Sequence, residues 1–332
     1  MPAPSTATSH WPLAASACAP TFAAPPQNCR HAGHADGAAV TDDSLAAWVR
    51  QHLKAPLLSR QPVGGGCIHR AWQLQLADGR RFFAKTNGAA ALPLLQAEAD
   101  GLKALAAAAG ADLVVPQPLH CAVVEGEAVL LLPWLTLAHG GSSQAWSDFG
   151  AALACLHRRS AAGPSLRFGW PHDNFIGSNP QRNGWGDHWG RFFAERRLGV
   201  QLELAAAKGK QLPGSQQLLA DLPGWLDDHG PDPCLVHGDL WSGNAALLHD
   251  SSLPALFDPA VYRGDREVDL AMARLFGGFP ADFFLGYGRE WPLPPGEARR
   301  RLVYDLYHLL NHANLFGGGY WRQAQALIDR LL

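Results

Sequence analysis

Three features that would each mark a class of protein are missing from this sequence. Basic charge is not in excess, because 27 Lys and Arg residues stand against 29 Asp and Glu, and this argues against binding nucleic acid through a broad basic surface. The longest nearly apolar run, residues 128–138, contains Pro133 and Thr136 and is too short to span a bilayer. The six cysteines form no C-x-x-C pair, so a reducing, cytoplasmic setting fits best. We expect neither nucleic acid nor a membrane as partner.

Length and composition favour a two-lobed globular protein with an extension at its start. A chain of 332 residues that is 47% hydrophobic can bury a full core in each lobe. Residues 1–40 are rich in Ala, Pro, Ser and Thr without sustained periodicity, and we expect a disordered extension there. The prolines in this segment disfavour a signal peptide. Cys29, His31 and His34 could form half of a metal site, but structural zinc normally takes four ligands.

The clearest chemical signature is residues 235–244, which read Leu-Val-His-Gly-Asp-Leu-Trp-Ser-Gly-Asn. The catalytic loop of protein kinases reads H-R-D-L-x-x-x-N. The residues at the same offsets are His237, Asp239, Leu240 and Asn244, with Gly238 in place of the arginine. A lone H-G-D would equally fit an ordinary strand and turn. A second carboxylate, Asp258, ends another short apolar run, as the metal-binding aspartate of a kinase does, and this favours phosphoryl transfer.

A glycine-rich turn and a hairpin precede this loop, as they do in kinases. The glycines of the turn are Gly64, Gly65 and Gly66. Glycines let a backbone approach phosphates closely, and Lys85, at the end of the hairpin, would supply positive charge beside them. Because the glycines do not form G-x-G-x-x-G, the turn alone would equally fit a flexible start to a hairpin. Glu98, on an Ala-rich helix predicted for residues 92–109, is spaced to hold Lys85, although such a glutamate is often a solvated surface residue.

The remaining patterns predict an α+β, two-lobed, protein-kinase-like fold. The N-terminal nucleotide-binding lobe, residues 41–135, is predicted as a small antiparallel sheet with one main helix, and the C-terminal catalytic and substrate lobe, residues 136–332, as mostly helical. Trp134 and Leu135 form the predicted hinge between them. Residues 168–180 are predicted as a polar loop. Helices in the C-terminal lobe are predicted at 146–157, 185–207, 297–316 and 320–332.

From residue 42 to 332 the chain resembles the fructosamine kinase (ketosamine 3-kinase) family, a branch of the aminoglycoside-phosphotransferase-like kinases. The segments that carry the resemblance are 63–68, 173–178, 237–244, 257–262, 264–272, 275–279, 307–312 and 314–320. The sequence departs from the family pattern at Pro133 in the hinge, at His69 and at Arg263. None of these three positions belongs to the predicted catalytic set.

The resemblance implies a kinase that uses ATP and Mg²⁺ to phosphorylate the 3-hydroxyl of a ketosamine, either a small molecule or an adduct on a protein lysine. The unstable 3-phosphate would then eliminate and free the amine, which amounts to deglycation. Carried onto this chain, Asp239 is the base, and Asn244 and Asp258 hold Mg²⁺. Lys85, positioned by Glu98, binds the ATP phosphates, with the three glycines and the hinge completing the nucleotide site.

The same resemblance places further residues around the acceptor substrate. They are Asp173, Asn174, Trp189, Arg197, Trp241 and His308. Asp173 and Asn174 would equally fit a simple Asx turn. His308 and His312 lack the glutamate of H-E-x-x-H, so we expect them to line the pocket wall or to bond within the core rather than hold a metal. Asp265 and Asp269 are predicted to brace the catalytic loop through its backbone amides.

Cys67 lies in the glycine-rich turn, where the resemblance implies a thiol linked to disulfide-mediated control. The protein would then be a monomer or a redox-dependent dimer. A small residue filling a tight turn explains Cys67 equally well.

Two other functions stay open at this point. A kinase of another hydroxylated amine, such as an aminoglycoside or choline, shares the H-x-D-x-x-x-x-N pattern, and the loop at residues 173–177 is the feature that discriminates it. A non-catalytic nucleotide-binding module would be expected to lose at least one residue of the catalytic set. That set is complete, with Lys85, Asp239, Asn244 and Asp258 all present.

Overall fold

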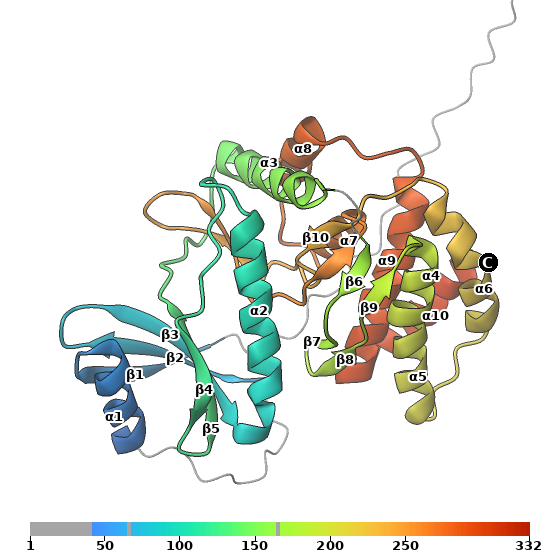
Figure 1. The fold of residues 1–332 in the computed structure, drawn as a ribbon. Coiled ribbons are helices and arrows are strands. Elements are labelled where there is room, and N and C mark those ends of the chain that lie inside the picture. Colours follow the sequence, from blue (N-terminus) through green and yellow to red (C-terminus); the bar gives the residue numbers. More distant parts are fainter. Residues whose placement is uncertain (1–41, 65–67, 164–166) are drawn as a thin grey trace, which may run out of the picture.

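The computed structural model describes residues 42–64, 68–163 and 167–332, and Figure 1 shows the two lobes they form. The N-terminal lobe contains a five-stranded antiparallel sheet with the strand order β1-β2-β3-β5-β4. Its strands are β1 (Leu57–Val63), β2 (Arg70–Leu76), β3 (Arg81–Gly88), β4 (His120–Val124) and β5 (Glu127–Pro133). Its helices are α1 (Asp42–Leu53), the short 3₁₀ turn η1 (Ala89–Ala91) and α2 (Leu92–Ala108).

Alternation along β5 explains why both faces of this sheet are covered. Leu130 and Leu132 pack with the α2 side chains, whereas Leu131 between them packs with α1. Successive side chains of a strand point to opposite faces, so a run of apolar residues serves two layers. The sheet therefore lies between α1 and α2 (Figure 1), and α2 extends from it toward the C-terminal lobe.

Most of the C-terminal lobe is helical. Its helical segments are α3 (Ser143–Ser160), α4 (Trp189–Phe193), the π-helical turn η2 (Ala194–Leu198), α5 (Gly199–Ala207), α6 (Ser215–Asp227), α7 (Glu267–Leu275), α8 (Ala281–Glu290), α9 (Glu297–Phe316) and α10 (Tyr320–Leu331). Its short strands are β6 (Phe168–Trp170), β7 (Asn174–Ile176), β8 (Asn179–Gln181), β9 (Gly184–Gly186), β10 (Cys234–Val236), β11 (Ala245–Leu247), β12 (Pro254–Leu256) and β13 (Tyr262–Gly264). They form a sheet of order β10-β13-β6-β9 and two hairpins, β7–β8 and β11–β12.

The two lobes touch where α2 crosses the segment that follows Asp258. A Cβ added at Gly101 of α2 would lie 3.1 Å from a methyl of Val261 and 3.2 Å from the ring of Pro259. The helix that carries Glu98 is thus in close contact with the segment that carries Asp258.

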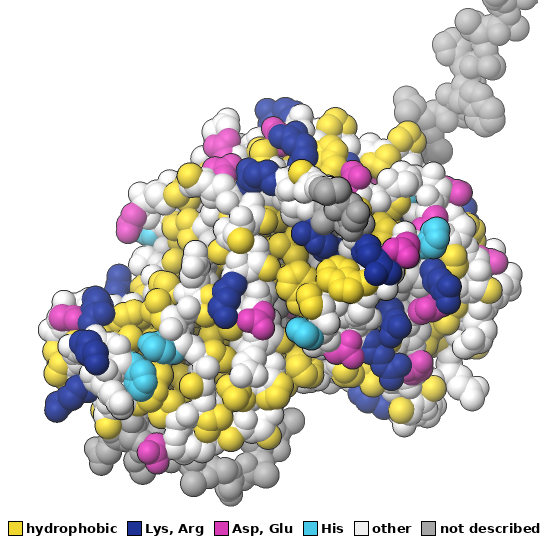
Figure 2. All heavy atoms as spheres, viewed as in Figure 1, with side chains coloured by type: hydrophobic (Ala, Val, Ile, Leu, Met, Phe, Trp, Pro, Cys, Tyr) yellow, Lys and Arg dark blue, Asp and Glu magenta, His cyan; other side chains and the backbone are white. Residues whose placement is uncertain are grey.

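Side chains of both signs are interspersed with apolar ones on the face shown in Figure 2.

The predicted fold class is confirmed, while several element boundaries were wrong. The helix predicted at 185–207 begins at Trp189, because residues 184–186 form β9 against β6. The predicted polar loop at 168–180 contains three short strands, and β1 was not predicted at all. Val114 and Val115 form no named strand, and Val114 makes one parallel bridge to Ala255. Strands of three residues are too short to show a period of two.

Several predictions concern residues outside the described ranges. They are the extension at residues 1–40, Gly65, Gly66 and the proposed redox cysteine Cys67. Within the ranges the structure describes, no helix combines the length and apolar character needed to cross a membrane.

Candidate active site

The loop between β10 and β11 carries the kinase-like residues, and a glycine lets it turn. Gly238 has φ +81°, and a Cβ there would overlap the carbonyl oxygen of Ala260. The backbone of Ala260 also donates to the carbonyl of His237 over 2.9 Å. No side chain fits between the two segments, which is why glycine stands where the protein-kinase pattern has arginine.

Asn244 joins the two segments that carry the predicted active-site carboxylates. Its Nδ2 donates to the backbone oxygen of Asp239 over 2.9 Å and to the Asp239 carboxylate over 3.2 Å. The same nitrogen lies 3.3 Å from the backbone oxygen of Asp258. These bonds use the amide nitrogen and leave the side-chain oxygen of Asn244 as a ligand atom. The side chain of Asp258 is 51% exposed, so its carboxylate is accessible to a cation. Carboxylates are among the oxygen ligands that bind Mg²⁺ in proteins.

Asp258 has a strained backbone. Its φ is +59°, a left-handed conformation that is uncommon for residues other than glycine, although aspartate and asparagine adopt it more often than most. Such conformations persist where the surrounding structure imposes them, and they cluster at active sites and ligand clamps. The strain at this position supports a functional rather than a purely structural interpretation of the carboxylate.

Lys85 on β3 connects α2 to Asp258. Its Nζ lies 2.9 and 3.0 Å from the two carboxylate oxygens of Glu98 and 2.8 Å from Oδ1 of Asp258. The predicted pairing of Lys85 with Glu98 is therefore present. Burial would lower the pKa of Lys85, but Asp258 and Glu98 raise it above its ordinary value, so the ammonium stays charged. Burial raises the pKa of Glu98 to about 7 against the attraction of Lys85.

Asp239 has the electrostatic environment of a base that can exchange a proton near neutral pH. Burial raises its pKa to about 7, repulsion by Asp258 adds to this, and the bond from Asn244 opposes it. A base is most effective when its pKa is close to the working pH. Asp239 can accept a proton from a hydroxyl that comes within hydrogen-bonding distance of its carboxylate.

Asp269 of α7 braces the catalytic loop, as predicted. Its Oδ2 accepts from the backbone N–H of His237 over 2.7 Å and its Oδ1 from that of Gly238 over 2.8 Å. Nε2 of His157 bonds the same carboxylate over 3.1 Å. The histidine of the motif is also fixed, because His237 Nε2 bonds the carbonyl of Phe257 over 3.0 Å. Contacts from α7 and from the carbonyl of Phe257 thus fix the conformation of the loop.

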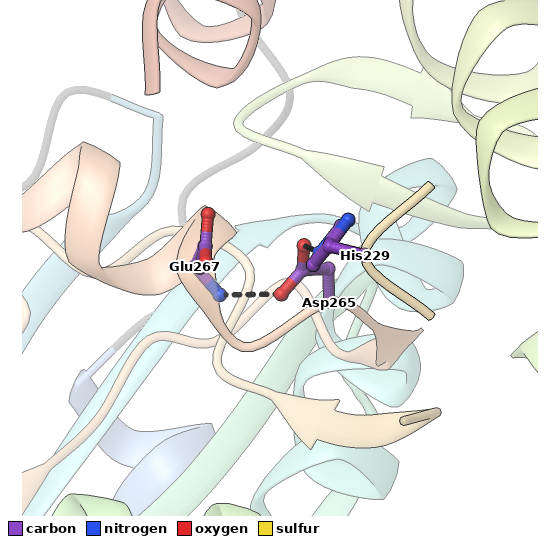
Figure 3. Close-up of side chains that lie close together, drawn as sticks. All are labelled: His229, Asp265 and Glu267. Carbon is purple, nitrogen blue, oxygen red and sulfur yellow. Dashed lines mark hydrogen bonds and ion pairs between the residues drawn. The ribbon is translucent and has the colours of Figure 1, made fainter. Parts of the chain in front are cut away.

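The bracing role predicted for Asp265 was wrong. Its carboxylate accepts instead from His229 Nε2 over 2.7 Å, from the Tyr304 hydroxyl over 2.6 Å and from the backbone N–H of Glu267 over 3.0 Å. Figure 3 shows that His229 and the backbone of Glu267 reach this carboxylate from separate segments. Arg300 bonds both oxygens of Glu267, over 2.8 and 2.6 Å.

One group of side chains has the residue types of a metal site, but the contacts of its carboxylates do not suit a cation. The group consists of His229, Asp265 and Glu267. Their potential ligand atoms lie within 4.8 Å of one another. A cation placed among them would face the guanidinium of Arg300, which already neutralises Glu267 and occupies both of its oxygens. We call His229, Asp265 and Glu267, together with Arg300, the anchor cluster. Their contacts link α7, α9 and the loop after α6.

Three of the predicted substrate contacts are too deeply buried for that role. Trp189, Arg197 and His308 have 0% exposed surface, so none can touch a substrate in this conformation. Trp189 donates from Nε1 to Tyr304 over 3.0 Å. Burial and the nearby His312 lower the pKa of His308 to about 3, so its ring is neutral in the core.

Arg197, predicted to contact the substrate, is held by the connection between β8 and β9, just beyond the predicted polar loop. Its guanidinium donates to the carbonyl of Arg182 over 2.6 Å and to Oδ1 of Asn183 over 2.8 Å, and it lies 3.8 Å above the ring of Tyr262. It belongs to η2, where π-helical turns often mark functional regions. Here the turn places a buried cation beneath the β8–β9 connection.

Asn174 was predicted to contact the substrate and is buried instead. Its Nδ2 donates to the carbonyl of Val261 over 2.7 Å, and its Oδ1 accepts from Gln181 and Asn183. Sequence reasoning missed Gln181 and Asn183, because nothing in their local pattern reveals that they are buried. Asp173 next to Asn174 is exposed and accepts from the backbone N–H of Asn183 over 2.7 Å, in a link that spans the loop.

The remaining predicted positions keep accessible surface. Trp241 is partly buried against the core of the C-terminal lobe. Trp134 and Leu135 follow β5 and are partly buried at the predicted hinge, and Gly64, just after β1, is exposed. These positions, together with Asp173, can still face ligands.

The comparisons with known proteins agree with this geometry. A model of the fructosamine kinase family matches residues 41–332. A protein named "probable ketoamine kinase" from Synechocystis sp. is 46% identical over 292 residues, which cover 87% of this chain and 96% of that protein. The chloroplastic protein-ribulosamine 3-kinase of Arabidopsis thaliana is 36% identical over 300 residues, 89% of each chain.

A solved structure extends the agreement to the fold. A Haemophilus somnus protein assigned as a fructosamine-3-kinase superposes with a TM-score of 0.78 at 28% identity, covering 87% of this chain and 97% of that one. The match supports the two-lobed, protein-kinase-like architecture. By its sequence, and in accord with the geometry of its cleft, this chain is a phosphotransferase of the fructosamine kinase family.

Proposed function

We propose that this protein uses ATP and Mg²⁺ to phosphorylate the 3-hydroxyl of a ketosamine, free or attached to a protein lysine. One contact supports the arrangement above all others: the Asn244 amide nitrogen reaches both Asp239 and Asp258, beside the Lys85–Glu98 pair. Phosphoryl transfer depends on positioning and on charge stabilisation, and this constellation provides both. The substrate class is supported by the names of the relatives.

Each polar group of the cleft has a separate role in the proposed reaction. Asp239 accepts the proton of the attacking sugar hydroxyl, for which its pKa of about 7 is suited. Lys85, fixed by Glu98, would bind nucleotide phosphates. Asn244 and Asp258 would hold Mg²⁺, which when bound neutralises charge on the transferred phosphoryl group. Asp269 keeps the loop that carries Asp239 rigid.

The substrate side of the cleft is proposed to be formed by accessible side chains only. Trp241 offers an aromatic surface beside the base, and Asp173 offers a carboxylate that could meet the amine. In a ketosamine 3-phosphate the carbon that bears the amine would lose a proton toward the neighbouring carbonyl, and the resulting enaminol would expel phosphate from C3. Water would then hydrolyse the imine that is left and release the amine. Under this proposal the kinase step starts deglycation.

The experiment that tests the proposal measures phosphoryl transfer from ATP to ribulosyl-lysine, fructosyl-lysine, an aminoglycoside and choline. We expect turnover of a ketosamine and little or none of the other two classes. Asp239→Asn should lower kcat for the ketosamine by about 10³-fold, within the range for loss of a general base. Preferred turnover of choline or the aminoglycoside would refute the ketosamine assignment, and equal turnover by Asp239→Asn would remove Asp239 from its role.

A further inference from the structure

Residues 276–279, in the connection between α7 and α8, have no role in the reaction described so far. Its two phenylalanines are anchored in different places. The Phe276 ring lies 4.4 Å from that of His312 on α9, and the Phe279 ring lies 4.6 Å from that of Phe283 on α8. Phe276 belongs to the main core of the C-terminal lobe, whereas Phe279 belongs to the cluster around α3 and α8. The connection is therefore fixed at both ends.

Between these anchors, two glycines have the same type of backbone but different surroundings. Gly277 has φ +72° and Gly278 has φ +92°. At Gly277 an added Cβ would meet no atom of the described residues within 4 Å. At Gly278 it would overlap Cβ of Ser242 and lie 2.5 Å from its Oγ. Only Gly278 is pressed against the catalytic loop.

Ser242 lies in the middle of the turn that separates Asp239 from Asn244. Hydrogen bonds and close packing fix the conformation of this turn. The backbone N–H of Trp241 donates to the carbonyl of Asp239 over 3.1 Å, and that of Asn244 donates to the carbonyl of Trp241 over 2.9 Å. The Trp241 ring covers Gly243 so closely that a Cβ there would overlap the ring. A push on Ser242 would therefore move its neighbours rather than be absorbed.

We propose that Gly278 is a positioning residue for phosphoryl transfer: the fixed segment 276–279 sets the path of the catalytic loop through its contact with Ser242. The inference rests on the proposed function for the roles of Asp239, Asn244 and Trp241. It adds that glycine is required at 278 for space against this loop, and at 277 for backbone conformation alone. The Ser242 side of the contact is exposed, so the loop can respond to a change in Gly278 without unfolding of the core.

The test compares Gly278→Ala with its matched control, Gly277→Ala. Both substitutions place alanine in a left-handed conformation, so both should lower the melting temperature to a similar extent. Only Gly278→Ala adds an atom that collides with Ser242 of the catalytic loop. We expect it to lower kcat/KM for the ketosamine by about 10- to 100-fold more than the control does, because small misplacements of reacting groups carry losses of this order.

Three further measurements separate positioning from general damage. Ser242→Gly in the Gly278→Ala background removes the colliding atoms, and we expect it to restore at least half of the lost activity relative to Ser242→Gly alone. KM for ATP should change less than KM for the ketosamine, because Ser242 adjoins Trp241, which the proposed function places beside the acceptor. If Gly278→Ala does not fold, Ser242→Val enlarges the same contact from the exposed side and should reproduce the loss.

Equal losses in the two alanine variants, or no recovery with Ser242→Gly, would overturn the inference. Hydrolysis of ATP in the absence of an acceptor is measured as a second readout, which keeps the test of Gly278 independent of the substrate assignment. If the parent protein transfers phosphate to no ketosamine, the proposed function fails, and the ratio of Gly278→Ala to Gly277→Ala in ATP hydrolysis still decides whether this contact positions the loop.

Discussion

Two clusters of acidic side chains lie near each other in sequence, and they differ in what their oxygens are used for. In the cleft, Asp258 pairs with Lys85 but keeps about half of its side chain exposed. In the anchor cluster, Asp265 accepts three bonds and Glu267 is held by Arg300 on both oxygens. By composition alone, the anchor cluster resembles a metal site more closely than the cleft does. The comparison shows that unused ligand atoms, rather than clustered ligand residues, identify a site.

Backbone geometry draws the same distinction between the clusters. Asp258 has a positive φ, whereas Asp265 and Glu267 are not among the described residues with that strain. Such conformations are frequent at functional sites, and they also occur in turns outside the site, as at Glu125 and Ser252. Substitutions at Asp258 and its neighbours should therefore lower activity, whereas substitutions in the anchor cluster should lower the free energy of unfolding.

The largest effect is expected for Asp258→Asn. Asparagine tolerates a left-handed backbone, so the substitution removes the charge and little else. We expect kcat/KM to fall by at least about 100-fold and the Mg²⁺ concentration for half-maximal rate to rise, because a neutral ligand binds the cation less well. Rates measured against Mg²⁺ concentration test this, with thermal unfolding as the control for folding. An unchanged Mg²⁺ dependence would exclude Asp258 as a ligand.

Glu267→Ala should instead act on stability. It leaves the guanidinium of Arg300 buried without its partner, and we expect the free energy of unfolding to fall by about 3–5 kcal/mol. The matched control is Glu297→Ala, which breaks the more exposed pair of Glu297 with Arg274 and should cost about 1 kcal/mol or less. Urea unfolding measures both. Equal losses in the two variants would mean that the anchor cluster has no special structural importance.

A smaller, pH-dependent effect is expected at Asp305, a buried acid of α9 outside both clusters. Burial raises its pKa to about 7 from 3.8, despite nearby Arg301. Between these values the folded protein binds more protons than the unfolded chain, so Asp305 lowers stability as pH rises, and the full loss is present above pH 7. Asp305→Asn should add roughly 1–3 kcal/mol at pH 8 and much less at pH 4. An equal gain at both pH values would contradict the assigned ionisation.

No effect at all is expected when divalent metals are removed from the ligand-free protein. The anchor cluster is closed by Arg300, so chelation followed by dialysis should leave the melting temperature unchanged. Elemental analysis of the purified protein provides another readout. Zinc retained at one ion per chain and lost in His229→Ala would show that the cluster binds metal and that the distinction drawn between the clusters is wrong.

The sequence predicted which residues of the proposed catalytic set lie together, because such a set depends on residue type at short spacing. The positions of His237, Asp239 and Asn244 within one loop follow from a turn of eight residues, and the long C-terminal helices follow from sustained apolar periodicity. The pairing of Lys85 with Glu98 also followed, since strand and helix lengths restrict where a lysine and a glutamate can meet. These are properties of neighbouring residues or of regular elements.

The tertiary structure alone decided which polar residues face the cleft. Trp189, Arg197 and Asn174 are as suitable for a substrate by residue type as Trp241 is, but burial depends on contacts from segments distant in the chain, which no local pattern records. The same holds for Gly278, whose need for space comes from Ser242, a residue of a different loop. The chemical type of each residue can be read from the local sequence. Its exposure to solvent, and the hydrogen bonds that its lone pairs accept, depend on the packing of the whole chain.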